Sequence, residues 1–193
     1  VKIGDFWIDR YEYPNVAGQL PRVDVSWEEA QQLCAARSQR LCTEAEWELA
    51  ARGPDNFDYS YGNQFEPRRC NAPWPDGKRW IRSGDTTQSG HFAGCQSPAG
   101  VSDMVGNVWE WCSDWFSPDF HLAATRDNPV GPKSGDRKLM RGGSFLCHDS
   151  YCNRYRCAAR TANTPDSSTA VSYTPLTLPT ILSFLIFAVL APQ

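Results

Sequence analysis

The sequence lacks a long apolar run, histidine pairs and an excess of positive charge. Its most apolar late stretch, residues 181–191, covers about 11 residues, whereas a membrane-spanning helix needs about 20. The three histidines, His91, His121 and His148, have no metal-ligand spacing. A formal net charge of −3 gives no electrostatic support for nucleic-acid binding. These absences argue against a membrane span, a histidine metal centre and a nucleic-acid partner.

The chain is rich instead in cysteine, tryptophan, glycine and proline. Eight tryptophans beside 14 glycines and 14 prolines predict one loop-rich α+β domain, in which aromatic packing holds short helices and strands. Eight cysteines favour an oxidising compartment, so we expect an exported, periplasmic or lumenal protein. Because the chain starts at Val1 and not at Met, we expect it to be a fragment.

Local patterns predict one early strand and two helices. Alternation over residues 5–14 predicts the strand. A capping box ahead of each apolar run predicts helices over about 27–37 and 44–52. The boxes are Ser26 with Glu29 and Thr43 with Glu46, and the expected apolar face of the second helix includes Ala45, Trp47 and Leu49.

Residues 53–105 show many turn signals and little periodicity. Cys70 and Cys95 bracket much of this region, and we expect them to form a disulfide. Closing a loop of about 25 residues is worth roughly 3 kcal/mol in the chain-entropy model. The bond would hold a long loop that has no core of its own.

The segment 141–160 carries three cysteines at a spacing of five, namely Cys147, Cys152 and Cys157. Nearby guanidinium groups lower a thiol pKa, and the thiolate is the form that binds metal or attacks. The segment therefore resembles a reactive-thiol site, although such cysteines are more commonly disulfide partners, and their spacing fits a zinc site poorly. The arginines of this region are Arg137, Arg141, Arg154, Arg156 and Arg160.

A dense aromatic block lies earlier in the chain, at residues 103–116. Asp103 and Glu110 supply carboxylates, and in an extended chain the carbonyls of Gly106 and Val108 would face the same way. Hard oxygen ligands of this kind suit Ca²⁺. The alternative is that Glu110 is a buried carboxylate paired with an arginine.

Three motifs together resemble the formylglycine-generating enzyme family, also called the sulfatase-modifying factor family. They are the segment 141–160 followed by Asn-Thr-Pro-Asp-Ser-Ser at 163–168, Gly-Asn-Val-Trp-Glu-Trp at 106–111, and Arg-Leu-Cys-Thr-Glu-Ala-Glu-Trp-Glu at 40–48. The resemblance covers about residues 1–169 and implies the family's own fold, which is similar to C-type lectins. The absence of His-x-x-x-His argues against the iron-dependent sulfoxide synthases of the same superfamily.

The resemblance also implies an activity. Enzymes of this family are oxidoreductases that use molecular oxygen to convert the cysteine of a Cys-x-Pro-x-Arg motif in an unfolded or extended sulfatase polypeptide to Cα-formylglycine. Cys147 and Cys152 would bind Cu(I) as soft thiolates. Ser144 would hydrogen-bond the oxygen or the substrate sulfur, while Trp109 and Tyr151 would form walls of the site. We expect the protein to act as a monomer.

Calcium is the second cofactor that the resemblance implies. One Ca²⁺ would lie at Asp103, Gly106, Val108 and Glu110. Another would lie near Asn71 and Ala72, with Asp85 as a further candidate. The competing function is a non-catalytic binding module, in which Cys147 and Cys152 form a permanent disulfide.

The chain departs from the family after Ser168. Residues 170–193 read as a tail that is not native, in place of a strand whose cysteine would pair with Cys34 in relatives. In the family, a cysteine often stands at the position of Ala51 and would pair with the equivalent of Cys157, so this chain lacks that partner as well. Cys42 or Cys112 could pair with Cys157 instead, and the sequence leaves this open.

Overall fold

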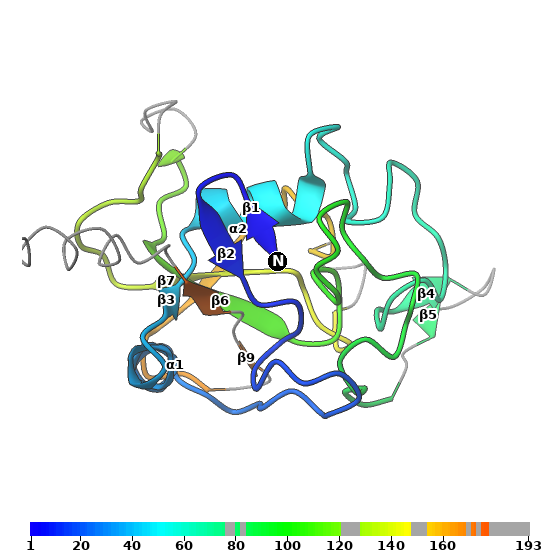
Figure 1. Ribbon diagram of the computed structural model, residues 1–193, viewed down its shortest axis with the longest axis horizontal. Coiled ribbons are helices and arrows are strands. Elements are labelled where there is room, and N and C mark those ends of the chain that lie inside the picture. The colour runs from blue at the N-terminus through cyan, green and yellow to red at the C-terminus, as the bar shows by residue number, and fades with distance from the viewer. Residues whose placement is uncertain are drawn as a thin grey trace, which may run out of the picture.

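The computed structural model describes residues 1–75, 80–81, 84–120, 128–147, 154–168, 171–172 and 175–177. Within them the fold is α+β, with two helices, two four-stranded sheets and one short hairpin joined by long loops (Figure 1). The helices are α1 (Trp27–Ala36) and α2 (Glu44–Arg52). This architecture confirms the predicted loop-rich α+β class.

The first sheet joins segments that are far apart in the chain. Its strand order is β1-β2-β10-β3, and all its pairs are antiparallel. Leu176 of β10 lies opposite Ile8 on one side and Arg40 on the other. The strands are β1 (Lys2–Ile3), β2 (Phe6–Ile8), β3 (Arg40–Leu41) and β10 (Pro175–Thr177).

The second sheet has the order β8-β7-β6-β9 and carries the aromatic block. Glu110 of β6 lies opposite Arg141 of β7, while β9 pairs with β6 in parallel. A separate hairpin, β4 (Trp74–Pro75) with β5 (Trp80–Ile81), projects from the loop region. The sheet strands are β6 (Trp109–Trp115), β7 (Lys138–Arg141), β8 (Thr161–Asn163) and β9 (Val171–Ser172).

Strands β9 and β10 lie beyond residue 169, where the sequence predicted the native domain to end. Both strands pair with strands from the first 115 residues of the chain. The predicted boundary at residue 169 and the tail over 170–193 stay predictions.

Both predicted helices are confirmed, and their caps explain where they begin. The Ser26 hydroxyl accepts a hydrogen bond from the Glu29 amide at 3.1 Å, and Thr43 with Glu46 forms both halves of a capping box. The predicted apolar face of α2 is right at Trp47, which is fully buried, and wrong at Leu49, which is 49% exposed. The buried residues of α2 are Glu44, Trp47, Ala50 and Ala51.

The predicted strand over residues 5–14 is too long, since only Phe6–Ile8 forms strand there. A turn follows, in which the Asn15 amide donates to the Glu12 carbonyl at 2.8 Å and the Asn15 side chain accepts from the Tyr11 amide at 3.1 Å. These local bonds replace the ladder bonds that a strand would need.

A buried ion-pair network joins α2 to the second sheet. The side chain of Arg141 is fully buried, and it pairs with Glu44 at 2.7 Å and with Glu48 at 2.6 Å. Arg160 also pairs with Glu44, at 2.5 Å. The guanidinium of Arg141 lies over the ring of Trp47. These contacts fix the start of the thiol segment against the helix.

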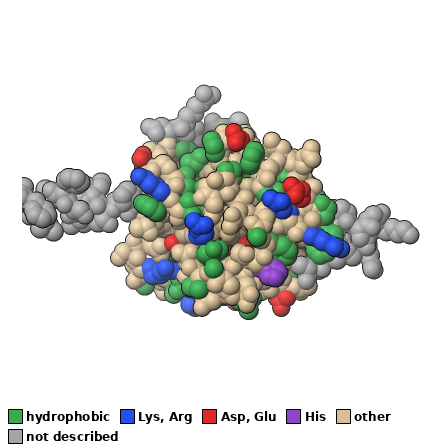
Figure 2. Space-filling model, turned by 45° about the vertical axis from the view of Figure 1, so that its right-hand side comes forward, with side chains coloured by type: hydrophobic (Ala, Val, Ile, Leu, Met, Phe, Trp, Pro, Cys, Tyr) green, Lys and Arg blue, Asp and Glu red, His purple; other side chains and the backbone are tan. Residues whose placement is uncertain are grey.

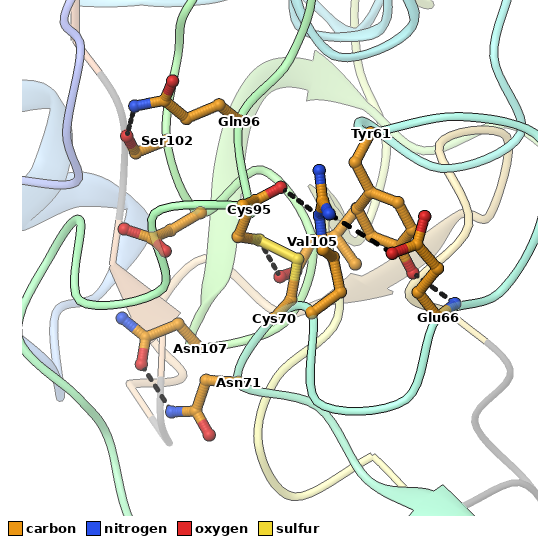
Figure 3. The surroundings of a disulfide bond; sticks show 12 residues. Tyr61, Glu66, Cys70, Asn71, Cys95, Gln96, Ser102, Val105 and Asn107 are labelled. Atoms are coloured by element: carbon orange, nitrogen blue, oxygen red, sulfur yellow. Dashed lines mark hydrogen bonds and ion pairs between the residues drawn. A yellow bond between two sulfur atoms is a disulfide. The ribbon is translucent and has the colours of Figure 1, made fainter.

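The loop region is closed by the predicted disulfide, which is therefore confirmed. Cys70 and Cys95 are bonded across a sequence separation of 25 residues (Figure 3). Arg69 donates to the Gly94 carbonyl at 2.6 Å, and the Cys95 sulfur lies 3.4 Å from the Val105 carbonyl oxygen. The bond therefore anchors the loop close to the aromatic block.

The described surface carries mixed charges. Figure 2 shows acidic and basic side chains interspersed over one face, with apolar groups between them. Among the described residues, none of the helices has the length and apolar character needed to cross a membrane.

Candidate functional site

The thiol segment leaves β7 through two glycines and then forms a tight turn. The backbone of Gly142 and Gly143 has φ of 86° and 77°, a region that L side chains rarely adopt. A Cβ on Gly143 would come within 3.1 Å of the Arg154 carbonyl oxygen. The backbone angles therefore favour glycine at both positions, and at Gly143 the close passage of residues 154–155 favours it further.

Cys147 lies at the end of this turn, almost fully buried. Its amide donates to the Ser144 carbonyl at 3.0 Å, while the Ser144 amide lies 3.4 Å from the Cys147 sulfur. The Ser144 hydroxyl accepts from the Leu146 amide at 3.2 Å. Cys147 itself is disulfide-bonded. Two further predicted site residues, Tyr151 and Cys152, lie outside the described residues.

Hydrogen bonds join the thiol turn to the aromatic block. The Gly106 amide donates to the Gly142 carbonyl at 2.9 Å, and the Phe145 amide donates to the Asn107 carbonyl at 3.0 Å. The Asn107 amide in turn donates to the Asn71 carbonyl at 2.8 Å. The structure thus brings together three stretches that the sequence singled out separately.

Asn107 is the centre of this junction. Its side-chain oxygen accepts from Asn71 Nδ2 at 2.8 Å and from the Thr87 amide at 2.9 Å. Its side-chain nitrogen donates to Glu12 Oε2 at 2.7 Å and to the Thr87 carbonyl at 3.2 Å. Sequence reasoning missed Glu12 and Thr87. The one sequence signal for this junction was Asn107, because a polar residue inside an aromatic run needs hydrogen-bond partners when it is buried.

Three carboxylates are buried here, and Asp103 and Glu110 both lie close enough to Glu12 to repel its charge. Burial, followed by repulsion from Asp103 and Glu110, raises the pKa of Glu12 well above its ordinary value. Burial also raises the pKa of Asp103 to about 6, although its carboxylate accepts from the Gly90 amide at 2.6 Å. Clustered buried negative charge of this kind favours a nearby cation.

One premise of the calcium prediction is wrong. The chain is not extended over the predicted ligands, because Asp103, Gly106 and Asn107 all have positive φ, of 62°, 82° and 53°. The strand β6 starts only at Trp109. The carbonyls of Gly106 and Val108 therefore cannot be placed by strand alternation.

The residues of the second predicted calcium site fit a hard cation. The Asn71 side-chain oxygen is buried without a hydrogen-bond partner, while its nitrogen donates to the Asp85 carbonyl at 3.0 Å. A Cβ on Gly106 would lie 2.4 Å from the Asn71 carbonyl oxygen, so only glycine fits there. Amide and carbonyl oxygens are ordinary calcium ligands. Among the described residues, no three acidic, histidine or cysteine side chains form a metal cluster.

The arginines order the segment, and they do not lower every thiol pKa in it. Burial raises the pKa of Cys157 to about 12, despite the nearby charges of Arg141 and Arg52. Arg141 also donates to the Cys157 carbonyl. Trp109 is partly buried at the start of β6 and packs against both hydrophobic clusters of the core. It can line a site while it supports the core.

A family model named "Sulfatase-modifying factor enzyme 1-like domain" matches residues 2–171. The chain belongs to this family. It is 47% identical over 163 residues to the formylglycine-generating enzyme of Thermomonospora curvata, covering 78% of this chain and 52% of that protein. It is 37% identical over 161 residues to the "Inactive C-alpha-formylglycine-generating enzyme 2" of Mus musculus, covering 78% of this chain and 46% of that protein.

A solved structure shares the fold of this chain. The structure of PvdO from Pseudomonas aeruginosa aligns with a TM-score of 0.70 at 18% identity, covering 90% of this chain and 80% of that one. At this identity the likeness shows the fold alone. The chain spans about half the length of the family enzymes that it matches.

Proposed function

We propose that the protein is a copper-dependent oxidase that matures sulfatases. Its substrate would be the cysteine of a Cys-x-Pro-x-Arg motif in an extended sulfatase segment, and its product Cα-formylglycine. The observation that supports this best is the position of Cys147, buried in a turn that is hydrogen-bonded to the Gly-Asn-Val-Trp-Glu-Trp block. The 47% identity to a formylglycine-generating enzyme supports the same activity.

The donor set fits Cu(I), because thiolate sulfur is a soft ligand. Cys147 would supply one sulfur and Cys152 the other, after two electrons and two protons open the disulfide of Cys147. Bound copper would supply the activation of oxygen beside the substrate thiol.

The protein's own residues would hold the reactants. The turn from Ser144 to Cys147 excludes water from the sulfur, and the Ser144 amide, 3.4 Å away, stabilises negative charge on it. Trp109 would form one wall beside the substrate. Replacing CH₂–SH by CHO inserts one oxygen atom and releases H₂S. The second oxygen atom then leaves as water, using two electrons and two protons from an added thiol.

The test is a turnover assay with the purified full chain, Cu(I), a thiol reductant, oxygen and a Cys-x-Pro-x-Arg peptide. Mass spectrometry should detect the aldehyde, with at least a 100-fold loss of rate in Cys147→Ser and Cys152→Ser. Cys157→Ala is the matched control, since it removes the third cysteine of the same segment, and it should keep the activity. If the Cys147→Ser/Cys152→Ser variant were as active as the parent, the proposed mechanism would be ruled out.

A non-catalytic binding module is the second candidate. Two observations favour it, namely the disulfide-bonded state of Cys147 and the likeness to a relative named inactive. Counting thiols before and after mild reduction separates the two functions. The oxidase requires two thiols that become accessible together and then bind Cu(I) at one per chain, whereas the module requires neither.

We also propose that Ca²⁺ stabilises the junction around Asn71, Asp103 and Glu110. Its supports are the unpartnered Asn71 side-chain oxygen and the three buried carboxylates. Adding Ca²⁺ to chelator-treated protein should raise the thermal midpoint, and Asn71→Leu should weaken that shift. An equal shift from Mg²⁺, or none from Ca²⁺, would contradict the proposal.

A further inference from the structure

Two buried cysteines outside the proposed site lie next to each other in the core. Cys42 lies between β3 and α2, and Cys112 lies in the middle of β6; neither side chain is exposed to solvent. The amide of Ser113, which directly follows Cys112, donates to the Cys42 carbonyl at 2.8 Å. This bond holds the two backbones together at the position of the two cysteines.

Both side chains belong to the same buried core cluster, and both thiols are free in this structure. A disulfide joins residues whose Cα atoms are usually about 4.4–6.8 Å apart, which is the range of neighbouring hydrogen-bonded backbones. The backbone is already paired there, so bond formation requires side-chain rotation and not a refolding of the strands.

A third buried thiol lies close by, and it offers a competing partner. Cys34 of α1 is near enough to Cys42 that charge on the Cys42 thiol would raise the pKa of Cys34, although burial is the larger cause of the raised pKa of Cys34. No backbone hydrogen bond is seen to join Cys34 to Cys42, whereas Ser113 and Cys42 are joined directly. A metal centre is a poor alternative, because the described residues contain no group of three metal-binding side chains suited to an ion.

We propose that Cys42 and Cys112 form a disulfide when the chain folds under oxidising conditions. The two thiols lose two protons and two electrons and form one S–S bond. A small disulfide such as oxidised glutathione takes up the electrons and is released as two thiols. The bond would tie the residue that precedes the α2 cap to the strand that carries the Gly-Asn-Val-Trp-Glu-Trp block.

The bond is expected to form during folding and not by reaction of the native protein. Burial, together with the adjacent Cys42, raises the pKa of Cys112 well above its ordinary value. Thiol–disulfide exchange requires a thiolate and access to it, and the folded core provides neither. Once formed, the same burial protects the bond from reductants that open exposed disulfides.

Peptide mapping tests the proposal on the full chain. The reduced, denatured protein is refolded in a glutathione redox buffer, alkylated and cleaved by trypsin together with a protease that cuts before aspartate. Residues 41–52 and 103–113 then fall on separate peptides with one cysteine each. We expect these two peptides to be linked. A link from 41–52 to residues 24–37, which carry Cys34, or full alkylation of both peptides, would overturn the proposal.

Variants sharpen the result. Cys34→Ala should keep the 41–52 to 103–113 link, while Cys42→Ala and Cys112→Ala should each abolish it and free the remaining thiol for alkylation. Oxidised Cys34→Ala should melt higher than oxidised Cys42→Ala, by on the order of 5–15 °C. Because the map of the parent chain decides the pairing by itself, a variant that fails to fold leaves the test intact.

Discussion

Two neighbouring stretches of the chain are held in place by different means. Residues 27–52 form the two helices, which dock on the sheets through buried side chains and the ion pairs of Arg141. Residues 53–105 are mostly turns, held by one disulfide and by side-chain hydrogen bonds around Asn107 (Figure 3). The helices are thus held by packing and buried ion pairs, whereas the loops are held by a covalent bond and by side-chain hydrogen bonds.

The largest expected effect comes from breaking the ion-pair network of the helical stretch. Arg141→Met should lower the free energy of unfolding by about 3–5 kcal/mol, because it removes a fully buried guanidinium from Glu44 and Glu48 and leaves buried Glu44 with Arg160 alone. Denaturant unfolding measures this loss. Arg22→Met is the control, since its pair with Glu29 is exposed and should cost less than about 1 kcal/mol. Equal effects from the two variants would show that burial of the network does not matter.

A smaller effect should come from opening the loop stretch. The Cys70→Ala/Cys95→Ala variant should lose about 3 kcal/mol, because the unfolded chain gains the freedom of a 25-residue loop. Hydrogen exchange should rise first in residues 53–105 and leave α1 and α2 protected. If the helices lost protection equally, the two stretches would form one cooperative unit and the contrast between them would fail.

The smallest effect concerns pH. Burial raises the pKa of Cys157 to about 12, so the folded thiol keeps a proton that the unfolded thiol loses above about 8.5. This contribution is complete below the unfolded pKa and is lost as pH rises toward the folded pKa. Between pH 8.5 and 10 the free energy of unfolding should fall about 1.5 kcal/mol further in the parent than in Cys157→Ala. Parallel curves of unfolding free energy against pH for the parent and Cys157→Ala would contradict this expectation.

Sequence patterns predicted the features that depend on local chemistry. The capping residues Ser26 and Thr43 predicted where both helices begin. The position of Cys70 and Cys95 on either side of a long loop predicted the disulfide between them. The patterns failed where distant segments decide the outcome. Leu49 lies on the exposed face because Trp47 and Ala50 face the core, and the alternation after Ile8 ends in a turn.

The site was predicted as separate motifs and not as a junction. Asn107 meets Asn71 and Phe145 through backbone hydrogen bonds between residues 36 and 38 positions apart, which no local pattern reports. Glu12 joins them from another element and was missed for the same reason. The backbone hydrogen bond between Ser113 and Cys42 likewise depends on how the end of β3 lies against β6.

The position of β10 bears on how fast the protein reaches its fold. This strand separates β2 from β3, although its residues follow both by more than 130 positions. Closing such long loops is entropically costly, so these pairings are expected late along the folding route. Until β10 arrives, β2 leaves one edge open and β3 has no partner strand in this sheet, so the half-formed sheet is a place where two chains can pair by mistake.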